Sequence, residues 1–311
     1  MTFSVALCHP FSTPSPSTAM STSVVFQLNQ TGTWFENLAV RPNGQIVATR
    51  MDLGQLWLID PFAKTGKKLV DVPGVISTIG IAEYKPDVFA FGGGNFSLNP
   101  VSLAAGSMKV FSLDLTKELP VVTLITPLPN AGFANGLTAW SETEVLVADT
   151  NGGTVYKVDI TTGNAAIIFS GEDFVGVNGL RVQSGYLYCS STDTQRFFRV
   201  PVGADAMAAG PVEILTSGFP QDDFALAADD TAYIAGMEQN QLIQVLADGQ
   251  TTTIAGEPDN LEVAASTSAR FGRTPVDSNV LYVTTSGGAL QRIFGNYTEP
   301  AKIVAVKLNN V

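Results

Sequence analysis

Glu36, Asn135, Asn178 and Asp222 occupy the same place in successive copies of a repeated sequence pattern, each at the start of a short apolar run. Carboxylate and carboxamide oxygens are the ligands that Ca²⁺ and Mg²⁺ prefer, so these residues are candidate ligands of one divalent cation. The same groups can hydrogen-bond or activate a substrate. The candidate catalytic residues are Asn135, Asn178, Asp222 and, at the corresponding place in another copy, Thr78.

The two Asn-Gly dipeptides in this set also have a simpler interpretation. Taken alone, Asn135-Gly136 or Asn178-Gly179 would be read as a turn, because Asn and Gly favour reversals of the chain. Their recurrence at one phase of the repeat, beside Glu36 and Asp222, favours a common site instead.

Aromatic side chains lie close to these polar positions. Trp34, Phe133, Phe174 and Phe219 each precede a polar position by two to four residues, Phe224 follows one, and Thr267 opens the last copy. Any one aromatic residue is expected to pack in the core. Their shared placement favours an apolar mouth above a polar floor, which is the usual composition of a small-molecule pocket. These six are the predicted substrate-binding residues.

The elements that must position these residues are short strands. Six copies begin near Glu36, Thr78, Asn135, Asn178, Asp222 and Thr267, and four of the five intervals between them are 42 to 45 residues. Within a copy, apolar segments of strand length are separated by turn dipeptides such as Asn43-Gly44, and helical periodicity is absent. A strand-built repeat of about 40 to 50 residues is typical of a β-propeller blade. The sequence therefore predicts an all-β fold, a six-bladed β-propeller with four-stranded antiparallel blades.

The propeller interpretation also predicts positions within the ring. The first segment of each copy is expected to be the innermost strand, so the polar residues that open the copies would meet at one end of the channel. Apolar segments at 24–28 and 303–308 flank the six copies, and we expect one to complete a blade begun by the other. The predicted organisation is a disordered Ser/Thr/Pro-rich tail over 1–23 and a single propeller over 24–311.

Composition limits the partners. Of 311 residues, 45% are hydrophobic and only 14% are charged, and the net charge of −11 disfavours nucleic acid and anionic membranes. No apolar run reaches the ~18 residues of a membrane span. The expected partner is a small hydrophobic molecule, and nothing in the sequence indicates the oligomeric state.

Cysteine and histidine content narrows the chemistry further. The two cysteines, Cys8 and Cys189, form no disulfide framework, which favours the cytoplasm, whereas Asn-x-Ser/Thr sequons at Asn29, Asn95 and Asn296 would suit a secreted protein. His9 is the only histidine and lies in the tail, which argues against a histidine base, a histidine metal ligand and a Ser-His-Asp triad.

The chain resembles the senescence-marker-protein/gluconolactonase family of six-bladed propellers, related to strictosidine synthase-like proteins. The resemblance rests on Asn135-Gly136-Leu137 with Trp140-Ser141, and on the last-blade segments 267–272 (TSARFG) and 281–284 (LYVT). It covers about residues 34 to 311. The family's Pro-Asp-Gly segment is matched only loosely, because Pro220 is displaced and Asp223 stands where the family has glycine.

The resemblance implies a metal site and a place in one branch of the family. In the family one divalent cation is held by a Glu, two Asn and an Asp, which correspond to Glu36, Asn135, Asn178 and Asp222, and the Asp is also the general base of the lactonases. The opening segment 34–45 (WFENLAVRPNGQ) is similar to a fungal natural-product branch, some members of which are hetero-Diels–Alderases. Those enzymes join an o-quinone methide to a terpene alkene.

Three functions follow as hypotheses. A cyclase for apolar natural products would require no cofactor, since orientation alone can remove ~7–11 kcal/mol of a barrier, and Asn135, Asn178 or Thr78 would donate a hydrogen bond to the heterodiene carbonyl. A lactonase or esterase would use one Ca²⁺ or Mg²⁺, with Asp222 or Glu36 activating water. A non-catalytic binding platform is the third, because a propeller fold alone does not decide function.

Overall fold

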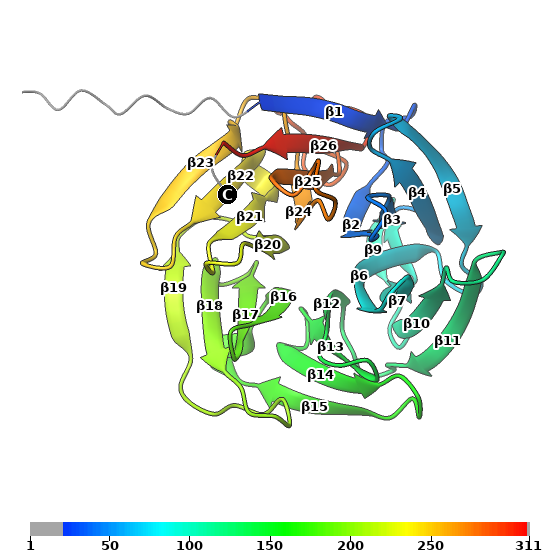
Figure 1. The fold of residues 1–311 in the computed structure, drawn as a ribbon, viewed down its shortest axis with the longest axis vertical. Helices are drawn as coiled ribbons and strands as arrows, with labels where there is room; N and C mark the ends of the chain where they lie inside the picture. Colours follow the sequence, from blue (N-terminus) through cyan, green and yellow to red (C-terminus); the bar gives the residue numbers. More distant parts are fainter. Residues whose placement is uncertain (1–20, 310–311) are drawn as a thin grey trace, which may run out of the picture.

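The computed structural model describes residues 21–309, and they form an almost entirely β-structure. Six four-stranded antiparallel sheets are arranged as blades around a central axis (Figure 1). The region enclosed by their six inner strands is the channel. The only helical segments within 21–309 are two 3₁₀ turns, Glu172–Phe174 and Met237–Gln239. The predicted fold, a six-bladed β-propeller with four-stranded antiparallel blades, is confirmed.

Each blade runs from an inner strand at the channel to an outer strand at the rim (Figure 1). The first blade consists of β2 (Phe35–Val40), β3 (Ile46–Arg50), β4 (Gln55–Asp60) and β5 (Thr65–Asp71). The second consists of β6 (Ser77–Lys85), β7 (Val88–Gly94), β10 (Lys109–Asp114) and β11 (Val121–Pro127). The third consists of β12 (Ala134–Ala139), β13 (Glu144–Asp149), β14 (Thr154–Asp159) and β15 (Ala165–Ser170). The fourth consists of β16 (Val177–Gln183), β17 (Tyr186–Ser191), β18 (Arg196–Pro201) and β19 (Glu213–Ser217). The fifth consists of β20 (Phe224–Leu226), β21 (Ala232–Gly236), β22 (Gln241–Val245) and β23 (Thr251–Gly256).

The sixth blade closes the ring with both ends of the chain. It consists of β24 (Ser266–Phe271), β25 (Val280–Thr285), β26 (Lys302–Lys307) and, as its outer strand, β1 (Ser21–Gln27). The expectation that one flanking segment completes the other's blade is therefore confirmed. Residues 21–23, predicted to belong to the tail, lie in β1 because their main chain pairs with residues 305–307 of β26. The rest of the predicted tail, residues 1–20, lies outside the described residues.

The inner strands share a local irregularity that aims the polar residues. The register between inner and second strand shifts between Phe35 and Leu38, between Ala134 and Leu137, and between Val177 and Leu180. A bulge adds an unpaired residue and re-aims its side chain. Glu36, Asn135 and Asn178 each lie inside one of these bulges. Their side chains therefore do not follow the regular alternation of side chains between the two faces of the sheet.

Glycine after each bulged asparagine allows neighbouring inner strands to approach closely. A Cβ on Gly136 would lie 1.9 Å from the carbonyl oxygen of Asn178, and one on Gly179 would lie 2.3 Å from a carboxylate oxygen of Asp223. Both Asn-Gly pairs are therefore strand residues at the channel rather than turns, as their recurrence predicted.

The hydrophobic core is divided among the spaces between blades. Between the third and fourth blades, for example, Leu146, Val155 and Leu187 are fully buried in one apolar cluster. Apolar side chains therefore fill the body of the ring, and the polar residues that the bulges release remain at the channel. Over residues 21–309, no helix has the length and apolar character needed to cross a membrane.

Candidate functional site

A cavity of about 240 Å³ lies at the end of the channel where the inner strands begin. Glu36 of β2, Asn135 of β12, Asn178 of β16 and Asp222, just before β20, all line it. The four side chains are buried, each with 5% or less of its surface exposed. The structure thus brings together from four blades the residues that the sequence predicted as one set.

Hydrogen bonds hold two of these groups against each other and leave several oxygens free. The Asn178 amide donates to Thr192 Oγ1 and to Asp222 Oδ1, both at 2.9 Å. Trp34 Nε1 donates to Glu36 Oε2 at 2.5 Å. Of the oxygens on these four side chains, three are buried and have no partner within residues 21–309: Oδ1 of Asn135, Oδ1 of Asn178 and Oδ2 of Asp222. The floor of the cavity is therefore rich in acceptors.

Burial and mutual repulsion favour the protonated form of both carboxyl groups. Burial raises the pKa of Glu36 from 4.5 to about 8; the Trp34 hydrogen bond opposes the rise and the charge of Asp223 adds to it. Burial also raises the pKa of Asp222 well above its ordinary value, and the charges of Glu36 and Asp223 add to that rise. At neutral pH and without a cation, Glu36 is then mostly neutral and can donate a hydrogen bond.

The same groups fit a divalent cation by the chemistry of their atoms. The three unpartnered oxygens and the Glu36 carboxylate are hard ligands of the kind that Ca²⁺ and Mg²⁺ take. Among residues 21–309, no group of three or more His, Cys, Asp or Glu side chains is placed to hold a metal. A cation here would therefore need the carboxamide oxygens of Asn135 and Asn178 as well as the two carboxylates.

Aromatic rings form one continuous wall of the cavity. Trp34, Phe96 and Phe133 all line it. The ring of Phe96 lies 6.4 Å from that of Trp34 in an edge-to-face arrangement and 5.9 Å from that of Phe133. Met51, Met237 and Leu290 add apolar surface at other points of the lining. The predicted apolar mouth over a polar floor is present, and Trp34 and Phe133 belong to it.

Two aspartates fix the segments that carry the predicted wall residues. The main-chain N–H of Trp34 donates to Asp52 at 3.0 Å, and that of Phe133 donates to Asp149 at 2.7 Å. Because each carboxylate accepts a main-chain hydrogen bond, the backbone at both rings is held in one conformation. The main chain that carries these two rings is therefore anchored at both places.

Three of the predicted substrate-binding aromatics lie elsewhere. Phe174 is buried between blades, stacked 5.0 Å from Phe169. Phe219 packs against the cluster that contains Phe224, and Phe224 is fully buried with the Arg181 guanidinium 5.1 Å from its ring. The placement of all three at the mouth was wrong, because these rings pack in the core instead. Core packing is the ordinary use of aromatic residues.

The two predicted threonines also miss the cavity. Thr78 Oγ1 donates to the main-chain oxygen of Gln55 at 2.7 Å and accepts from Arg50 N at 2.8 Å, which ties the second blade to the first. Thr267 Oγ1 donates to the main-chain oxygen of Phe35 at 2.7 Å, which ties the sixth blade to the first. Both hydroxyls are committed to the backbone, so their predicted catalytic and binding placements are corrected.

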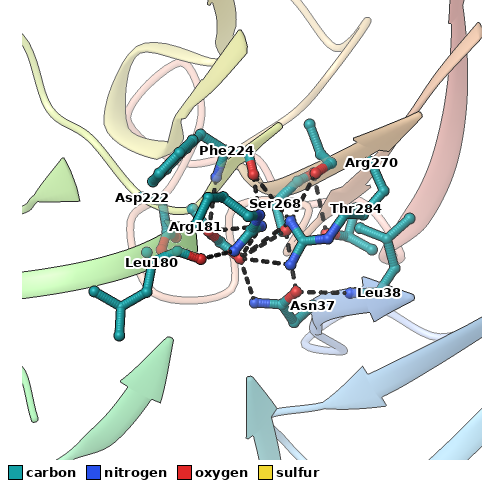
Figure 2. Close-up of polar contacts among 12 residues, drawn as sticks. Asn37, Leu38, Leu180, Arg181, Asp222, Phe224, Ser268, Arg270 and Thr284 are labelled. Carbon is teal, nitrogen blue, oxygen red and sulfur yellow. Dashed lines mark hydrogen bonds and ion pairs between the residues drawn. The ribbon is translucent and has the colours of Figure 1, made fainter. Parts of the chain in front are cut away.

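Below the cavity, the buried carboxylate of Asp223 is the centre of an ionic network. Figure 2 shows its partners gathered from three inner strands, namely Asn37, Arg181, Ser268 and Arg270. Its carboxylate accepts from Asn37 at 2.8 Å, Ser268 at 3.1 Å and Arg181 at 2.9 Å, and Arg270 lies 3.5 Å away. Arg181 and Arg270 also line a second cavity, formed where the inner strands end. The Asp223 network therefore separates the two ends of the channel.

Sequence reasoning missed several lining residues, among them Phe96, Thr150, Thr192 and Gln221. Phe96 belongs to a hairpin, β8 (Phe96–Leu98) and β9 (Val101–Leu103), inserted between β7 and β10. The longer spacing from the second to the third copy was the available signal. Gln221 immediately precedes Asp222, so its proximity was readable from the sequence although its environment was not.

Comparison with curated proteins gives two fungal relatives. An alignment of 308 positions, covering 81% of this chain and 75% of the relative, gives 29% identity to a Sarocladium schorii protein named "Putative hetero-Diels-Alderase asR5". An alignment of 318 positions, covering 89% of this chain and 88% of the relative, gives 26% identity to a Phoma protein named "Putative hetero-Diels-Alderase". No family model matches the chain.

Comparison with solved structures shows the fold. The calcium-binding protein regucalcin of Agrobacterium tumefaciens superposes with a TM-score of 0.67 at 16% identity, covering 93% of this chain and 96% of its own. A gluconolactonase of Xanthomonas campestris gives 0.66 at 12% identity, covering 93% and 90%.

The fold defines the class as a six-bladed β-propeller, which is the fold of regucalcin and of the gluconolactonase and the fold that the sequence resemblance predicted. Both curated relatives carry the name "Putative hetero-Diels-Alderase", in agreement with the branch predicted from residues 34–45.

Proposed function

We propose that the protein is a cyclase that joins a reactive heterodiene, such as an o-quinone methide, to a terpene alkene by a hetero-Diels–Alder reaction. The observation that carries the proposal is the composition of one cavity, where the contiguous rings of Trp34, Phe96 and Phe133 stand over a floor of unpartnered polar atoms. The names of the two curated relatives support the same reaction class.

Such a reaction needs the two partners held in register more than it needs chemical groups from the protein. The aromatic wall offers a rigid apolar surface for the hydrocarbon partner, because main-chain hydrogen bonds fix Trp34 and Phe133. Holding both partners in a near-attack arrangement converts a bimolecular reaction into a unimolecular one, which can lower the barrier by ~7–11 kcal/mol.

Of the three predicted donors Asn135, Asn178 and Thr78, Asn135 is the best placed toward the heterodiene oxygen. Negative charge grows on that oxygen in the transition state, so a hydrogen bond to it is stronger there than in the ground state. The Asn178 amide is already engaged by Thr192 and Asp222, and Thr78 is bound to the backbone. The side chain of Asn135 lines the cavity and makes no hydrogen bond within residues 21–309.

A divalent cation is compatible with this scheme. Bound by Glu36, Asn135, Asn178 and Asp222, it would supply Lewis-acid polarisation of a substrate oxygen. In this proposal the chain's own part is to position the two partners and to exclude water from them, and cyclisation requires no cofactor.

The test uses an o-quinone methide generated in situ from a 2-(hydroxymethyl)phenol, together with a cyclic terpene alkene, in EDTA. We expect the protein to accelerate formation of the cycloadduct and to give one enantiomer in excess. Asn135→Ala is expected to slow the reaction by ~100- to 1,000-fold, in the range for loss of one hydrogen bond to developing charge. A racemic product at the uncatalysed rate would refute the proposal.

A metal-dependent lactonase or esterase is the second candidate, favoured by the three unpartnered oxygens of Asn135, Asn178 and Asp222. It predicts hydrolysis of a hydrophobic lactone that EDTA abolishes and Ca²⁺ restores, and that Asp222→Ala eliminates. Chelator-resistant cyclisation that tolerates Asp222→Asn would exclude it. The binding-platform hypothesis called for a flat mouth without aromatic residues, and the aromatic-lined cavity does not favour it.

A further inference from the structure

Gln221 is a buried amide with no hydrogen-bond partner at either polar atom. Only 1% of the residue is exposed, and neither Oε1 nor Nε2 has a partner among residues 21–309. A buried donor or acceptor left unsatisfied costs ~1–3 kcal/mol, and native proteins rarely carry both on one side chain. A ligand or an ordered water is expected to complete these bonds.

The position of Gln221 makes a ligand the natural partner. The residue lines the same cavity as Asn135 and Trp34. Its main chain is held in place, because Thr192 Oγ1 donates to its carbonyl oxygen at 2.8 Å. The backbone is therefore fixed by a hydrogen bond while the amide at the end of the side chain is uncommitted.

The amide also differs chemically from the rest of the lining. The other unpartnered buried side-chain atoms of the described lining residues are oxygens, on Asn135, Thr150, Asn178 and Asp222. Gln221 Nε2 is the one nitrogen among them. A carboxamide offers a donor and an acceptor side by side in one plane, so it matches a ligand that presents an acceptor and a donor on neighbouring atoms.

We propose that Gln221 forms a polar subsite in the wall of the cavity that binds a carbonyl flanked by a hydroxyl on the substrate. Nε2 donates to the carbonyl oxygen and Oε1 accepts from the hydroxyl. The inference deepens the proposed function, on which it rests for the use of the cavity by a small organic molecule. It specifies the arrangement of oxygen atoms on the substrate that the protein selects. The apolar surface of the aromatic wall cannot distinguish one such arrangement from another.

The experiment measures binding without any reaction, by isothermal titration calorimetry in EDTA. The probes are 2-hydroxy-1-indanone, its methyl ether 2-methoxy-1-indanone, and 1-indanone, which share one apolar body and differ in the donor. The wild-type protein is expected to bind the hydroxy ketone about tenfold more tightly than the methyl ether, as one hydrogen bond to an otherwise unpaired group would give. In Gln221→Met, which keeps the length of the side chain, the ratio is expected to fall to about one.

A matched control separates this subsite from general effects. Gln250→Met makes the same exchange at an exposed position and is expected to keep the tenfold ratio. A wild-type ratio near one would overturn the proposal even if no Gln221 variant folds, and so would a tenfold ratio that persists in folded Gln221→Met. Because no cycloadduct is measured, failure of the cyclase proposal and failure of this one give different results.

Discussion

Replacement of Glu36 by glutamine should make the protein more stable at pH 8 than the wild type. Glu36 is 2% exposed, and its burial raises the pKa of the carboxyl to about 8. Above that pH the folded protein must hold a buried charge next to Asp222, whose pKa is also raised by burial and by the charge of Glu36. The amide that replaces this carboxyl in Glu36→Gln keeps its shape and never ionises.

The magnitude follows from the difference between the folded and unfolded pKa values. A rise from 4.5 to about 8, at 1.36 kcal/mol per pKa unit, corresponds to about 5 kcal/mol as an upper value. Between these two pH values the folded state binds more protons than the unfolded state, so the free energy of unfolding falls as the pH rises. The contribution is fully present below pH 4.5 and is lost as the pH passes 8.

Urea unfolding at pH 5, 6.5 and 8 in EDTA measures this directly. The wild type should lose several kcal/mol from pH 5 to pH 8, and Glu36→Gln should lose markedly less. Glu142→Gln, at an exposed site, is the control and should follow the wild type. If Glu36→Gln and the wild type decline in parallel over the whole range, the burial argument for this site is wrong.

Four further outcomes are expected. Phe96→Ala should weaken binding of the hydrocarbon partner by ~10-fold with little loss of stability, as measured by calorimetry with the cycloadduct; unchanged affinity would remove Phe96 from the wall. Phe174→Ala should cost ~3–5 kcal/mol in urea unfolding and leave ligand affinity unchanged, because its ring packs between blades. Asp223→Ala should cost ~3–5 kcal/mol, since it leaves two partly buried arginines without their shared carboxylate, and a loss below 1 kcal/mol would contradict the network. If the floor binds Ca²⁺, the ion should raise the free energy of unfolding at pH 8 in the wild type but not in Asp222→Ala.

The sequence predicted the floor of the cavity because a repeat converts position along the chain into position around a ring. Once the period is known, residues at equivalent positions of the repeat must lie at the same level along the propeller axis, on neighbouring inner strands. Glu36, Asn135 and Asn178 follow this rule, and the bulge that aims each one recurs with it. The same rule fails for Thr78, which turns to the backbone of the neighbouring blade.

The wall was less predictable because loops do not repeat. Phe174 and Phe133 both precede an asparagine of the floor, yet Phe174 belongs to a 3₁₀ turn that directs its ring between blades. Phe96 enters the cavity from a hairpin that only one blade possesses. Whether the Gln221 amide has hydrogen-bond partners depends on all of its neighbours in space, and no pattern in the sequence encodes their positions.

A crystal structure of the protein with the cycloadduct bound would test the central claim most directly. We predict the adduct in the cavity at the start of the inner strands, with its hydrocarbon part against Trp34, Phe96 and Phe133 and an oxygen within hydrogen-bond distance of Asn135. An adduct bound instead beside Arg181 and Arg270 at the opposite end of the channel, or found only on the outer surface of the blades, would contradict the account.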